Sequence, residues 1–148
     1  MKRFSFSLQK VLQLRKYREE ECKLELGKAV GALTEIENSI NAVASSRRLA
    51  ALERFSAADD MLIWENYITR LDKEADKLME EAAQAELVVE EKRELYLEAS
   101  RELKAMEKLK EKKKEEHRKT SLAAQTAELD IIQSYSKFAR NSLAAGNI

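Results

Sequence analysis

Few side chains in this sequence could carry out covalent chemistry. His117 is the only histidine among the 148 residues, and Cys22 is the only cysteine. A zinc site needs several such ligands and nucleophilic catalysis needs a nucleophile beside a base, so both residues lack the companions they would require. A phosphate-binding loop of the form G-x-x-x-x-G-K-[ST] is also absent from the sequence. The sequence therefore predicts a protein that is not an enzyme and uses no metal or cofactor.

The most concentrated charge lies in "KLKEKKKEEHRKT", residues 108–120. Seven basic side chains stand there against the three acidic residues Glu111, Glu115 and Glu116. The run has no aromatic residues on which bases could stack, and its glutamates would repel phosphates, so nucleic acid is not an expected partner. Three interpretations stay open: a solvated helix face, docking onto an acidic protein surface, and a nucleic-acid-binding coiled coil as the rival from another class.

The composition indicates an all-α protein made of long helices. The chain has no proline and three glycines, and 36% of its residues are charged whereas 6% are aromatic. Proline interrupts helices, so its absence favours long ones, and so few large side chains leave little material for a globular core. The 27 basic and 27 acidic residues balance, so any electrostatic role must be local. We expect a single elongated domain over residues 1–148.

An apolar seam follows the chain in alternating steps of four and three residues. It is unbroken from Cys22 to Val43, and it extends again from Met61 to Met106 with Lys92 as its only break. These steps are those of the a and d positions of a coiled coil. The two stretches therefore predict two helices that pack on each other.

A turn signal separates the two stretches. In "ERFSAADDML" (53–62), Ser56 followed by Asp59 resembles a helix-capping box. Two helices joined by a short turn run antiparallel, and at ~1.5 Å per residue the paired section would be roughly 70 Å long. In chain order we predict helix one at about 5–55, a turn at about 54–60, helix two at about 58–141 and a disordered tail at 142–148.

The second helix is predicted to overhang the first. With the turn near residue 57, helix one reaches no further than about residue 109, where the charge run begins. Beyond Thr120, apolar residues return in the same phase at Ala124, Ile131 and Phe138. We therefore expect helix two to leave its partner at the charge run and to dock its apolar end on another molecule.

The sequence shows no targeting or membrane-spanning signal. After the first three residues, the polar side chains of "FSFSLQK" interrupt any apolar core of a signal peptide, and no run approaches ~18 apolar residues. A single cysteine suits a reducing compartment. These features predict a cytoplasmic protein.

Several short motifs resemble the flagellar FliJ family. "FSFSLQKVLQLRKYREEE" at the N-terminus is similar to the opening of that family, and "LGKAVGAL" (26–33) is similar to a small-residue segment of its first helix. "WENY" (64–67) and "KRELYLEASRELKAMEKLKEKKKEEHRK" (92–119) are similar to elements of its second helix. The resemblance covers nearly the whole chain.

The resemblance implies a component of the flagellar type III export apparatus. FliJ-like proteins form an antiparallel two-helix coiled coil that resembles the gamma-subunit stalk of rotary ATPases. The implied partners are the ring of the export ATPase FliI and the export gate protein FlhA, at the cytoplasmic face of the inner membrane at the flagellar base. Contact with the membrane would be indirect, through the gate. An export chaperone or escort, with other export chaperones as partners, is the alternative role, and a monomer is one expected state.

The resemblance also assigns site residues. It places the end of the stalk that carries both termini in the ATPase ring. The residues implied to meet the ring are therefore Phe4, Phe6, Leu8, Lys110, Lys112, Lys113, Lys114, Arg118, Leu122, Ile131, Tyr135 and Phe138. The "WENY" match carries over Trp64 and Tyr67 as contacts of the export gate. Trp64 also falls on the predicted seam, so a core tryptophan is an equal interpretation. "NAVASSRRLA" (41–50) has no clear equivalent of the helix-one gate contacts.

Overall fold

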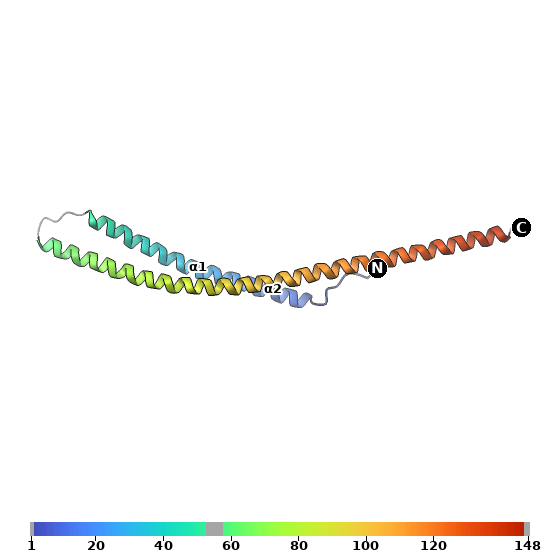
Figure 1. Cartoon of the computed structure of the whole chain (residues 1–148), viewed down its shortest axis with the longest axis horizontal. Coiled ribbons are helices and arrows are strands. Elements are labelled where there is room, and N and C mark those ends of the chain that lie inside the picture. Colours follow the sequence, from blue (N-terminus) through green and yellow to red (C-terminus); the bar gives the residue numbers. More distant parts are fainter. Residues whose placement is uncertain (1, 53–57, 147–148) are drawn as a thin grey trace. The chain divides into compact units, whose positions relative to one another are not determined.

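The computed structural model describes residues 2–52 and 58–146, and within these ranges it contains two helices and no strand. Helix α1 spans Gln9–Ala51 and helix α2 spans Ala58–Gly146 (Figure 1). The two long helices pack against each other, which confirms the predicted all-α hairpin. The absence of proline allows α2 to continue without a break over 89 residues.

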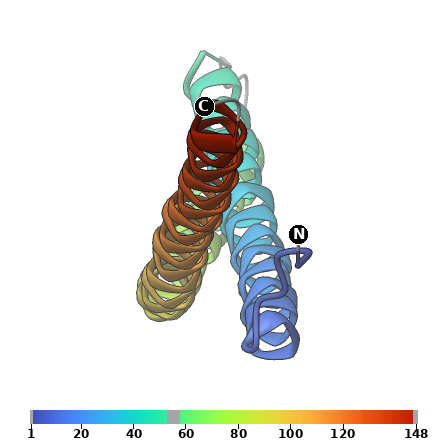
Figure 2. The same ribbon diagram turned by 90° about the vertical axis from the view of Figure 1, so that its right-hand side faces the viewer.

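The observed helix bounds differ from the expected ones at both ends of the chain. Helix α1 begins at Gln9, after a short non-helical stretch (dark blue in Figures 1 and 2), and the Gln9 backbone N–H donates to the Phe6 carbonyl oxygen at 3.1 Å. Helix α2 continues through Gly146, so the tail expected at 142–148 is helical as far as that residue. Most of the turn expected at 54–60, with Ser56 of the capping box, lies outside the described residues.

Contacts group the chain into two compact units, the first formed by Met1–Leu14 with Leu103–Ile148 and the second by Arg15–Glu102. In the second unit, α1 and α2 lie side by side (Figure 1). Arg47 Nε donates to Asp72 Oδ1 at 2.6 Å, and Arg15 pairs with Glu102. The residue number rises along one helix as it falls along the other, so the helices are antiparallel. The single elongated domain stays a prediction.

The predicted seam is the buried face of both helices. On α1 the less exposed residues recur in steps of three and four from Leu12 to Val43, and on α2 they recur in the same way from Trp64 to Met106. Ala99 is 1% exposed, and a side chain this small allows the two backbones to approach closely. The most buried apolar residues, all of them on the seam except Phe6, are Phe6, Leu12, Val43, Ala50, Leu71, Val89 and Ala99.

The seam departs from its predicted positions at Met61, which is 47% exposed, and at Arg47. A further step of four residues from Val43 leads to Arg47, but the Arg47 side chain is half-exposed and the neighbouring Ser46 is less exposed. The guanidinium stays in water and pairs with Asp72 at the edge of the seam, because an unpaired charge between two helices would lose its hydration. The hydrogen bond from Arg47 to Asp72 raises the pKa of the arginine above its usual range.

A matched pair of substitutions tests the seam. Leu71 is 5% exposed, so Leu71→Ala should lower the free energy of unfolding by about 2–4 kcal/mol through lost burial and a cavity. Leu87 on the same helix is 66% exposed, so Leu87→Ala should change the stability by less than about 0.5 kcal/mol. Chemical denaturation followed by circular dichroism measures both. Equal losses would contradict the assignment of the buried face.

Candidate functional site

All residues predicted to meet the ATPase ring lie in one compact unit. That unit combines the N-terminal stretch with the part of α2 from Leu103 onward. Trp64 and Tyr67, predicted to meet the gate, lie in the other unit. The structure therefore assigns the first set of candidates to one unit, although their binding role stays a prediction.

An extended N-terminal strap, residues 2–6, lies along α2 beside the charged run. His117 Nε2 lies 3.0 Å from the Lys2 carbonyl oxygen, and a carbonyl only accepts, so this nitrogen carries the proton and donates. The ring of Phe4 packs against the His117 imidazole with centroids 5.6 Å apart and a tilt of 52°. Phe6 is 8% exposed. The strap is therefore held at every second residue, namely Lys2, Phe4 and Phe6.

The strap corrects the expectation that α2 leaves its partner near residue 109. Helix α1 does end its pairing there, but the strap continues along the same face of α2 as far as His117. An extended chain advances about 3.3 Å per residue against 1.5 Å in a helix, so a few extended residues cover several turns. The charged run thus has one covered face.

His117 was missed as an important residue because it was expected in a fully solvated run. It is less exposed than its neighbours, and it lies seven residues after Lys110, which is also partly covered. A seven-residue step returns to the same helix face, so the spacing was the signal that could have found it.

The basic residues of the run differ in their surroundings. Lys110 is partly covered, whereas Lys112 and Lys114 are exposed. Lys113 Nζ lies 3.5 Å from a Glu116 carboxylate oxygen, one turn along the same helix. Lys112 and Lys114 therefore offer the more available positive charge among the predicted lysines.

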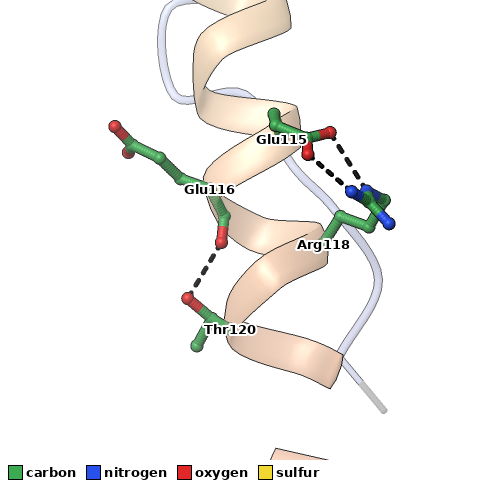
Figure 3. Close-up of polar contacts among 4 residues, drawn as sticks. All are labelled: Glu115, Glu116, Arg118 and Thr120. Atoms are coloured by element: carbon green, nitrogen blue, oxygen red, sulfur yellow. Dashed lines mark hydrogen bonds and ion pairs between the residues drawn. The ribbon is translucent and has the colours of Figure 1, made fainter. Parts of the chain in front are cut away.

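Arg118 forms a two-pronged ion pair within α2 (Figure 3). Its Nε and Nη2 donate to the two carboxylate oxygens of Glu115 at 3.0 and 2.6 Å. These bonds lower the pKa of Glu115 and raise the pKa of Arg118. One turn further, the Thr120 hydroxyl donates to the Glu116 carbonyl oxygen at 2.9 Å. Part of the positive charge of the run is thus satisfied within the helix.

A groove of about 590 Å³ begins at the end of the strap and follows α2. It is lined by Lys2, His117, Thr120, Ser121, Ala124, Gln125 and Glu128. The groove lies on the face of α2 that the strap covers upstream, so this face remains concave where the strap stops.

The C-terminal overhang, residues 122–146, is exposed throughout. Lys2 of the strap lies beside its beginning, where it lines the groove with Ala124 and Glu128. Its large apolar side chains include Ile131, Tyr135 and Phe138, which are 64%, 77% and 75% exposed, and Leu122, which is 47% exposed. Exposed apolar side chains of this size are typical of protein–protein interfaces, and the binding role of the overhang stays a prediction.

The two predicted gate residues have different surroundings. Trp64 lies half-buried on the seam, and its Nε1–H donates to the Ala50 carbonyl oxygen at 2.6 Å. Carbonyl groups in the last turn of a helix have no helical partner, so Trp64 caps the end of α1. Tyr67 is partly exposed, with the Arg70 guanidinium 5.3 Å from its ring centroid.

The remaining candidates for chemistry are isolated. Cys22 is half-buried on the seam beside a groove of about 190 Å³ that also includes Lys92 and Leu95. Among residues 2–52 and 58–146, no group of three or more His, Cys, Asp or Glu side chains could hold a metal ion. In the same ranges, no helix is long and apolar enough to cross a membrane.

Comparison with known proteins matches the chain to a family model. The family model described as flagellar FliJ protein matches residues 4–142, which is nearly the whole chain. Searches of curated proteins and of solved structures gave no match. The matched range includes most of the strap, the charged run and most of the C-terminal overhang.

The strap can be tested by removing its buried aromatic. Phe6→Ala should release residues 2–6 from α2, because it removes the most buried side chain of the strap. The order parameters of the backbone amides of residues 2–6, measured by NMR relaxation, should fall below about 0.6. Ser5→Ala, at an exposed position of the same segment, is the control and should leave them unchanged. A strap that stays ordered in both variants would contradict its anchoring by Phe6.

A second test concerns the pH dependence of the charged run. In Arg118→Gln the pKa of Glu115 should rise toward the ordinary value of about 4.3, because its main hydrogen-bond donor is gone. The folded-state pKa of Glu115 is lowered, so the pair stabilises the helix above the unfolded-state pKa, and this contribution is lost as the pH falls through the folded-state value.

The measurement is a pH titration of the Glu115 carboxyl ¹³C shift. Lys114→Gln removes an exposed charge of the same run and is the control, since Arg118 is the largest cause of the shift. If both variants move the titration of Glu115 equally, general charge and not the direct pair sets its pKa.

Proposed function

The chain belongs to the flagellar FliJ family, and from this premise we propose that it serves flagellar protein export as a coiled-coil stalk between the ring of the export ATPase FliI and the gate protein FlhA. Membership of the family gives the role in flagellar export. The more specific proposal of a stalk rests on one observation. The strap, the charged run and the exposed overhang belong to a single compact unit.

The proposed contact with the ATPase ring centres on the overhang. Tyr135 and Phe138 are three-quarters exposed, and aromatic side chains of this size supply much of the binding energy when a partner buries them. Phe6 is covered by its own chain, so its proposed part is to hold the strap and not to touch the ring. The residues predicted from the sequence to meet the ATPase ring thereby divide into two groups: residues that would contact the ring and residues that support them.

The charged run would guide the encounter. Lys112 and Lys114 are exposed, and positive charge beside an apolar surface speeds association with an acidic partner more than it tightens the final complex. Lys104, Lys108 and Lys119 are also exposed and lie eight, four and seven residues from Lys112, so they share one helix face with it. We propose this lysine face as the rim of the contact.

For the gate, the structure favours Tyr67 over Trp64 as the contact. The Trp64 indole N–H is bonded to Ala50, and the ring lies on the seam, so Trp64 would position the end of α1. Tyr67 keeps an exposed edge beside Arg70. Binding to the gate would place the protein at the cytoplasmic face of the inner membrane.

An export chaperone or escort is the second proposed role, and the exposed overhang favours it because a wide apolar helix face also suits flexible partners. The nucleic-acid alternative is weakened by the local pairs of Arg118 with Glu115 and Lys113 with Glu116, which compete with phosphates for the basic groups.

Stimulation of the purified export ATPase tests the stalk proposal. A chain that carries both Tyr135→Ala and Phe138→Ala should bind the ATPase at least about tenfold more weakly and lose most of its stimulation of hydrolysis. Leu87→Ala, which removes an exposed apolar side chain from the other unit, is the matched control and should stimulate normally. Circular dichroism shows whether both variants remain helical.

Truncation after Ser121 complements the substitutions, because it removes the overhang and keeps the strap and its partner residues. If the truncated chain still stimulates hydrolysis fully, the assignment of the overhang to the ring is wrong. If stimulation is unaffected but binding of export chaperones is lost, the second role replaces the first.

A further inference from the structure

We propose that two copies of this chain associate through their C-terminal overhangs, which pair as antiparallel helices centred near Ser134. The inference rests on the face and the charges of the overhang and is independent of the proposed function. Its occupant is a second copy of the same chain.

The apolar face of the overhang continues an existing interface. His117 and Ser121 are the last residues of α2 that the rest of the chain partly covers. Seven-residue steps from His117 reach Ala124, Ile131 and Phe138, and a seven-residue step returns to the same helix face. The face that packs against α1 and the strap therefore continues into the overhang, where it is apolar and uncovered.

The charges of the overhang are segregated along its length. Residues 122–146 contain four charged side chains, with Glu128 and Asp130 in the first half and Lys137 and Arg140 in the second. None of them has an oppositely charged residue three or four positions away, which is the spacing that allows ion pairs within a helix. They differ in this from Glu115 and Arg118, which pair one turn apart.

This arrangement is self-complementary when two overhangs run antiparallel. The acidic half of one copy then faces the basic half of the other, and each favourable pair occurs twice because of the two-fold symmetry. In a parallel pair, like charges would face each other and oppose association. The charge order therefore selects the antiparallel arrangement.

Apolar packing and charge pairing agree on one register. If Ile131 of one copy lies opposite Phe138 of the other, Glu128 comes within about one position of Arg140, and Asp130 within about two positions of Lys137. Tyr135 then lies next to the two-fold axis. This alignment covers Ile131, Tyr135 and Phe138 and brings Asp130 near Lys137 of the other copy. Arg140 lies nine residues from Ile131, on the opposite side of the helix, so its positive charge acts over a longer range than a direct pair.

The association is expected to be weak and reversible. The overhang is about 37 Å long at 1.5 Å per residue, which gives an interface at the small end of specific complexes. A dissociation constant on the order of 10 µM is expected. Tyr135 and Phe138 would be buried in the pair, so a second copy would compete for the side chains that the proposed function assigns to the ATPase ring.

Charge exchange in the full-length chain tests the proposal. Lys137→Glu with Arg140→Glu makes the overhang wholly acidic, and Glu128→Lys with Asp130→Lys makes it wholly basic. In sedimentation equilibrium, each variant alone should dimerise at least about tenfold more weakly than the unaltered chain. An equimolar mixture of the two should recover the association, and a chain with all four changes should dimerise like the unaltered one.

The control carries Lys112→Glu with Lys114→Glu, which changes exposed charges of the run outside the overhang and should leave dimerisation intact. Circular dichroism confirms that each variant is helical. An unaltered chain that stays monomeric up to about 300 µM overturns the proposal, as does a mixture that fails to recover. Association that is equal in all variants overturns the register and the charge pairing.

Cross-linking gives a second measurement of the direction. In a Cys22→Ser background, chains with Ala127→Cys should form disulfides with chains carrying Ser142→Cys, since the proposed register brings these positions together. Neither single-cysteine chain should cross-link with itself. Self-linked Ala127→Cys chains would show a parallel pair and overturn the antiparallel arrangement.

Discussion

The structure depends on one constraint, which is that each helix has a single partner on which it can bury an apolar stripe. Even on the seam most side chains keep part of their surface in water, and few described residues, such as Leu71 and Ala99, are nearly covered. Stability therefore comes from a long line of modest contacts, each roughly proportional to the apolar area removed from water. Where the partner ends, the helix must become charged or find another surface.

The seam and the antiparallel hairpin were predictable because a helix and its partner share one period. A repeat of about 3.5 residues fixes which face is buried, whatever the individual residue types are. The turn signal at Ser56 then implied the direction of the second helix. Arg47 shows the limit of this reasoning, since the period placed it on the seam and hydration of its charge moved it to the edge beside Asp72.

The strap could not be predicted from the same pattern. Residues 2–6 have no helical period, and an extended segment leaves no mark on the periodicity of α2 apart from one histidine. Residue type alone suggested that His117 was solvated, whereas its contacts with Lys2 and Phe4 come from the other end of the chain. The set of candidate residues was therefore found by resemblance, but the division into supporting and contact residues required the structure.

Charge patterns within α2 distinguish a solvated helix from a binding helix. In the charged run, some acids and bases lie three residues apart and pair within the helix, as Glu115 and Arg118 do, so part of this surface is satisfied without a partner. In the overhang, Asp130 and Lys137 are separated by two turns and have no opposite charge within local reach. An antiparallel second helix would bring opposite charges close to them and would cover the apolar residues between them. Both features support the proposal that the overhang is a docking surface.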